Sequence, residues 1–105
     1  MTEITPAELH ELITSGADFQ LIDVREPFEY EIANLGGTLI PLAEIIGAEE
    51  TISRDKPVVV HCRSGARSAT AIKALETRFG FTNLSNLKGG ILAYADQIDP
   101  SLAKY

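Results

Sequence analysis

Two short segments of this chain are apolar almost throughout, and they alternate with segments that have helical patterns. Residues 19–24 (Phe-Gln-Leu-Ile-Asp-Val) and residues 58–61 (Val-Val-Val-His), which follow Pro57, both predict buried strands. A strand that is apolar on both sides needs cover on both faces, which is typical of parallel sheets. We therefore expect an α/β fold, with a mostly parallel central sheet of about five strands flanked by helices on both faces.

The segments around these strands carry recognisable helix signals. Thr5, Pro6 and Glu8 are typical of a capped helix start, and Gly16 is placed to end that helix in a left-handed conformation. Further helices are expected at 27–32, 43–52 (a weak one, interrupted at Gly47), about 68–79 and 91–98, with short extended segments at 39–42 and 83–87.

Length and composition limit the class of protein. The 105 residues fit a single domain, residues 1–105, and its one cysteine cannot form an internal disulfide. No apolar run approaches the length of a membrane span, and the N-terminus has no secretory pattern, so we expect a cytoplasmic protein. The net charge of −6 argues against nucleic acid as a partner.

The single cysteine, Cys62, lies where a buried strand ends and a loop leads into a helix. Ligands of parallel α/β folds bind at this edge of the sheet. Loop N–H groups, the helix dipole and the charges of Arg63 and Arg67 would all favour a thiolate there. We therefore expect a lowered pKa and a nucleophile, although a cysteine that only packs in the core is the alternative.

The spacing within this loop separates two kinds of chemistry. In cysteine-dependent phosphatases, five residues separate the cysteine from the arginine that closes the loop. Here only four separate Cys62 from Arg67, and the next residue, Ser68, has no guanidinium. The shorter loop favours a smaller anion, such as a cysteine that carries one extra sulfur.

Three segments resemble the rhodanese-like domain family. Residues 62–67 (Cys-Arg-Ser-Gly-Ala-Arg) match the Cys-Arg-x-Gly-x-Arg active loop of that family. Residues 21–25 (Leu-Ile-Asp-Val-Arg) and 87–94 (Leu-Lys-Gly-Gly-Ile-Leu-Ala-Tyr) resemble its first and closing signatures. Residues 29–34 and 99–105 are more narrowly similar to the rhodanese domain at the C-terminus of sulfur-carrier adenylyltransferases, which serve molybdopterin and thiamine biosynthesis. Residues 33–35 (Ala-Asn-Leu) depart from the Gly-His-Ile of many members.

The resemblance implies a rhodanese-like fold and a sulfurtransferase that moves sulfane sulfur through a Cys62 persulfide. The donor would be thiosulfate or a persulfide, and a sulfur-carrier protein is one candidate acceptor. No metal and no cofactor are implied. A non-catalytic binding or regulatory module is the first alternative, and a cysteine-dependent phosphatase or arsenate reductase is the second.

Roles for the neighbouring residues follow from their place in the loop. The backbone amides of residues 63–68, which include Ala66, would stabilise the persulfide. Arg63 is expected to contact the donor, whereas Arg67 either does so or braces the loop. Ser64 can offer its hydroxyl to the persulfide. Gly65 is expected to adopt a backbone conformation that a Cβ would penalise, and Ser68 is expected to cap the next helix. Asp23 and Arg25, which share one side of a strand, are expected to form a structural ion pair near the loop, and His61 is expected to be non-catalytic.

Overall fold

A computed structural model describes residues 1–105. Its centre is a sheet of five strands that all run parallel, in the spatial order β1-β5-β4-β2-β3. The strands are β1 (Glu3–Ile4), β2 (Gln20–Asp23), β3 (Thr38–Leu39), β4 (Val58–His61) and β5 (Leu84–Leu87). The expected parallel sheet is confirmed, and the N-terminal edge strand β1 is the one that sequence patterns missed.

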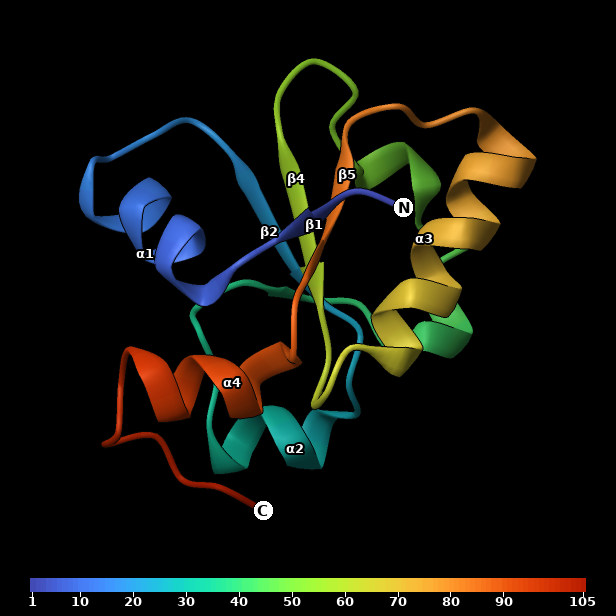
Figure 1. The fold of residues 1–105 in the computed structure, drawn as a ribbon. Coiled ribbons are helices and arrows are strands. Elements are labelled where there is room, and N and C mark those ends of the chain that lie inside the picture. The colour runs from blue at the N-terminus through green and yellow to red at the C-terminus, as the bar shows by residue number, and fades with distance from the viewer.

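Four α-helices surround the sheet, and three of them cover its faces (Figure 1). Helix α3 (Ala66–Phe79) lies on one face, whereas α1 (Pro6–Thr14) and α4 (Gly90–Gln97) pack together on the other. The short helix α2 (Pro27–Ile32) lies beyond the carboxyl ends of the strands, close to the turn from β4 into α3 (Figure 1). The Thr5 capping box and the positive φ of Gly16 confirm the predicted limits of α1.

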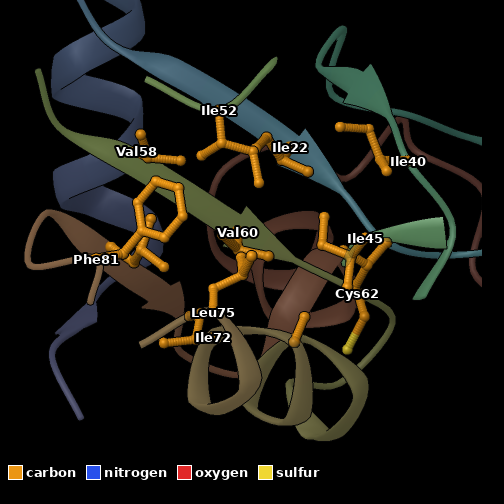
Figure 2. Close-up of a cluster of buried hydrophobic side chains, with 13 residues drawn as sticks. Ile22, Ile40, Ile45, Ile52, Val58, Val60, Cys62, Ile72, Leu75 and Phe81 are labelled. Atoms are coloured by element: carbon orange, nitrogen blue, oxygen red, sulfur yellow. The ribbon is translucent and has the colours of Figure 1, made fainter. Parts of the chain in front are cut away.

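The two faces of the sheet carry separate cores because side chains alternate along β4. Val58, Val60 and then Cys62 point toward α3, into a cluster with Ile72 and Leu75 (Figure 2). Val59 points the other way, into a smaller cluster that includes residues of α1 and α4. Cys62 therefore lies at the end of the larger core, with only 1% of its surface exposed.

Two of the predicted helices differ from the structure. Residues 43–52 form two 3-10 helices, η1 (Leu42–Glu44) and η2 (Glu49–Thr51), because this segment bends around Gly47 to bury Ile45 and Ile52 in the core. Helix α3 begins two residues earlier than predicted, with Gly65 at its N-cap. No helix in the structure has both the length and the apolar character that a membrane span requires.

Candidate active site

The Cys62 loop is a tight turn at the carboxyl edge of the sheet. Gly65 adopts a φ of +112°, which is a conformation that a Cβ would penalise, so the backbone conformation expected of this glycine is confirmed. On the outer side of the loop, the carbonyls of Cys62 and Arg63 accept hydrogen bonds from the Ile91 and Leu92 N–H groups at the start of α4, at 3.0 and 3.2 Å. With these carbonyls turned outward, N–H groups of the loop are left to face the sulfur.

The packing of α4 against this loop depends on Gly90. A Cβ at this position would overlap the Arg63 carbonyl group. The sequence pattern indicated only a turn at residues 89–90. The contact of this turn with the Cys62 loop, almost thirty positions earlier in the chain, follows from the order of the strands in the sheet.

Hydrogen bonds to Cys62 Sγ favour its thiolate. The Gly65 N–H donates to Sγ at 3.1 Å, and Ser68 Oγ lies 3.4 Å from it. Burial raises the pKa of the Cys62 thiol, but the Ser68 side chain and the amides of Ser68, Gly65 and Ser64 outweigh burial and hold the pKa below its ordinary value. The shift has the direction that the sequence predicted.

The sequence suggested that Ser68 caps α3, and this prediction is wrong. The helix begins at Ala66, and Ser68 lies inside its first turn. Its buried hydroxyl instead has three acceptors within reach: Asn86 Oδ1 at 2.6 Å, the Gly65 carbonyl at 3.2 Å, and Cys62 Sγ. One hydroxyl proton serves one acceptor at a time. Asn86, on β5, was missed from the sequence, although a polar residue in a buried strand is a signal that could have drawn attention to it.

Removal of the Ser68 hydroxyl is expected to raise the pKa of Cys62, since a hydrogen bond to the thiolate is lost. The measurement is the rate of Cys62 alkylation by iodoacetamide as a function of pH, in the wild type and in Ser68→Ala. Thr70→Ala is the matched control, because Thr70 Oγ1 bonds the Ala66 carbonyl one turn along the same helix, away from the sulfur. An alkylation profile of Ser68→Ala that superimposes on the wild type would contradict this account.

Arg67 is held by Glu29 of α2. Two of its nitrogens donate to the two carboxylate oxygens of Glu29, at 2.6 and 2.9 Å. The hydrogen bond from Arg67 lowers the pKa of Glu29 to about 2, and the same contact raises the pKa of Arg67. This geometry favours the bracing role for Arg67 among the two that the sequence left open.

The Glu29 carboxylate is expected to make stability depend on acid pH. Its folded-state pKa is below the unfolded value, so its contribution is complete above about pH 4.3 and is lost as the pH falls toward 2. Because the Arg67 side chain is 35% exposed and solvent screens the pair, we expect the Glu29 carboxylate to contribute about 2 kcal/mol to the free energy of unfolding. Urea unfolding gives the free energy of unfolding at each pH in this range. That free energy should change less with pH in Glu29→Gln than in the wild type; an equal pH dependence in both proteins would exclude the effect.

Asp23 and Arg25 form the predicted ion pair, fully buried beside the loop. Their closest nitrogen–oxygen distance is 2.7 Å, and Arg25 also donates to the Ala33 carbonyl at 2.7 Å. His61, on the face opposite Cys62, is also buried, with its Nε2 3.7 Å from Asp23 Oδ2. Burial lowers the pKa of His61, which favours its neutral form, and no contact of its ring with Cys62 Sγ is formed.

The other loop positions are more open. Ser64 and Ala66 are exposed, and Arg63 is half-buried against the C-terminal segment rather than against the sulfur. A pocket of about 340 Å³, lined by Val24, Glu26, Leu42, Ala43 and Arg67, opens beside the loop. The largest hollow of the molecule lies elsewhere, between β3 and the two 3-10 helices, away from Cys62.

These features define a class of domain: a parallel α/β sheet with a cysteine loop at its carboxyl edge, leading into a helix N-terminus. Residues 5–97 match the family model described as "Rhodanese-like domain". The chain belongs to the rhodanese-like domain family.

Relatives of known name extend this comparison. The chain is 36% identical over 105 aligned positions to the probable adenylyltransferase/sulfurtransferase MoeZ of Mycobacterium tuberculosis, a match that covers 97% of this chain and 26% of that protein. It is 39% identical over 98 positions to the adenylyltransferase and sulfurtransferase UBA4 of Eremothecium gossypii, covering 83% of this chain and 22% of that protein. The chain thus spans about a quarter of the length of these relatives, as the resemblance to their rhodanese domains predicted.

Solved structures of similar size share the whole fold. A rhodanese-related protein from Thermoplasma volcanium superimposes with a TM-score of 0.81 at 31% identity, over 93% of this chain and 94% of that one. A rhodanese-like domain protein from Staphylococcus aureus gives a TM-score of 0.82 at 27% identity, over 93% and 95% of the two chains. The predicted fold class is therefore confirmed.

Proposed function

We propose that this domain is a sulfurtransferase that carries sulfane sulfur on Cys62. The observation that carries the proposal is the position of Sγ, which accepts the Gly65 N–H at 3.1 Å at the start of a 14-residue helix. Backbone amides and a helix dipole that stabilise a thiolate stabilise a persulfide anion in the same way. The family, and relatives whose names include sulfurtransferase, support the same activity.

The reaction consists of two displacements at sulfur. The Cys62 thiolate attacks the outer sulfur of thiosulfate, a new S–S bond forms, and the old S–S bond breaks as sulfite leaves with its electron pair. A nucleophilic acceptor such as cyanide then attacks the terminal sulfur, takes it as thiocyanate, and restores the thiolate. Every step uses groups of this chain and its two substrates, so no cofactor takes part.

Arg63 is the residue that we assign to the anionic donor. It forms no ion pair with an Asp or Glu side chain, in contrast to Arg67, whose charge is compensated by Glu29. The loop is compact, the sulfur is buried and the pocket beside it is small. These features suit a small donor or an extended terminal segment of a protein. A sulfur-carrier protein is the acceptor that we propose for the cell, by analogy with the adenylyltransferase/sulfurtransferase relatives.

The intact mass of the protein tests this function. Incubation with thiosulfate should add one sulfur (~32 Da) to the chain, and a chase with cyanide should remove it. Because Cys62 is the only cysteine, the adduct has a single thiol on which to form. Absence of the adduct with thiosulfate and with a persulfide donor such as glutathione persulfide would overturn the proposal.

A further inference from the structure

The last residue of the sequence lies against the candidate active site. After α4, the chain turns back: the Asp99 N–H donates to the Tyr94 carbonyl at 3.0 Å, and Ser101 N–H bonds the Asp99 carboxylate at 3.1 Å. Leu102 packs against the smaller core, and Lys104 pairs with Asp96. Residues 98–105, here called the tail, therefore follow a defined path that ends next to α2 (Figure 1).

Tyr105 inserts its phenol group between two charged side chains. Its hydroxyl accepts a hydrogen bond from Arg25 Nη1 at 2.7 Å and donates one to Glu29 Oε2 at 2.8 Å. Arg25 is fixed by Asp23, and Glu29 is fixed by Arg67. The phenol hydroxyl thus connects two ion pairs, and its bonds add to the contacts of Leu102 and Lys104 that hold the tail in place.

The same ring lies beside Arg63 of the loop, which forms no ion pair with an Asp or Glu side chain. The Arg63 guanidinium carbon is 5.1 Å from the centroid of the Tyr105 ring, within the range of a cation–π contact, and Arg63 Nη2 donates to the Tyr105 backbone oxygen. A guanidinium has five N–H donors, so this contact leaves most of them for another acceptor. Arg63 is therefore restrained, while N–H donors remain for an anion.

We propose that Tyr105 is a positioning residue: through the Arg63 guanidinium, it preorganises the site that binds the anionic part of the sulfur donor. This inference rests on the proposed function, in which Arg63 contacts that anion. A long side chain that is already ordered before binding loses less conformational freedom when the anion arrives. The tail thereby takes part in recognition of the donor without contacting the sulfur.

The test uses sulfite, the product of the first displacement, as an anion that does not transfer sulfur to the reduced protein. Bound sulfite should protect Cys62 from alkylation by iodoacetamide, a neutral reagent that electrostatic steering does not favour. The measured quantity is the sulfite concentration that halves the alkylation rate. Thermal unfolding of each variant ensures that all assays are made on folded protein.

Two substitutions separate the ring from the hydroxyl. Tyr105→Leu removes both, and we expect it to raise the half-protecting sulfite concentration about three- to tenfold, with a similar rise in the thiosulfate KM and little change in kcat. Both variants keep the backbone oxygen, and Tyr105→Phe also keeps the ring, so its protection should stay within about twofold of the wild type. The unfolding temperature of Tyr105→Phe falls because Arg25 and Glu29 lose a partner.

A double mutant provides the decisive comparison. In an Arg63→Ala background, Tyr105→Leu should cause no further loss of sulfite protection, because its effect acts through Arg63. Unchanged protection in Tyr105→Leu, or an equal further loss in the Arg63→Ala background, would overturn the inference. Failure of the proposed function is a different result: sulfite would protect Cys62 in a manner that depends on Tyr105, while thiosulfate would add no sulfur.

Discussion

Cys62→Ser is expected to abolish sulfur transfer while the fold is retained. A serine hydroxyl at this position is too weak a nucleophile and holds no persulfide, so thiosulfate:cyanide turnover should fall by more than about a thousandfold. The sulfur adduct should be absent from the intact mass. Ser can still accept the Gly65 N–H that Cys62 Sγ accepts now, so the free energy of unfolding should change by no more than about 2 kcal/mol.

The control for this variant is Thr70→Ala, which removes an exposed side chain from the same helix and should keep both turnover and the adduct. Transfer that survives in Cys62→Ser would show that another group is the nucleophile. Loss of folding in Cys62→Ser would be evident from circular dichroism. In that case Cys62→Ala, which removes the sulfur and adds no polar group to the core, distinguishes loss of structure from loss of chemistry.

Asp23→Asn is expected to cause the largest loss of stability of any substitution near the site. The Arg25 side chain has no exposed surface, and Asp23 holds it with both carboxylate oxygens, at distances of 2.7 to 3.1 Å. Without that carboxylate, Arg25 remains as a buried and uncompensated charge, which costs about 3–5 kcal/mol. That is a large part of the roughly 5–15 kcal/mol that stabilises a typical domain.

Urea unfolding measures this loss of free energy. Two further variants test whether the loss comes from the buried charge of Arg25. Asp23→Asn combined with Arg25→Met should recover part of the stability, because no charge then stays buried without a partner. Asp18→Asn breaks an exposed pair with Lys56 and should cost less than about 1 kcal/mol. A cost for Asp23→Asn as small as that for Asp18→Asn would show that the buried pair does not hold this edge of the domain together.

The central strands and the first helices were predictable because their signals are local. β4 is a β-branched run bounded by Pro57, and α1 has its cap, its proline and its closing glycine within eleven residues of Thr5. Residues 43–52 were predicted wrongly because the need to bury Ile45 and Ile52 outweighs a weak helical preference. A similar tertiary effect explains Ser68, where the early start of α3 turns an expected cap into a neighbour of the sulfur.

The sequence by itself determined the fold class and the place of Cys62, because hydrophobic periodicity and loop spacing are properties of contiguous residues. Only the tertiary structure decided which groups surround the loop. Glu29, Asn86, Gly90 and Tyr105 come from four separate segments, and no local pattern indicates that they meet. Their meeting depends on the strand order and on the return of the tail after α4, which are set by the burial of apolar faces across the whole chain.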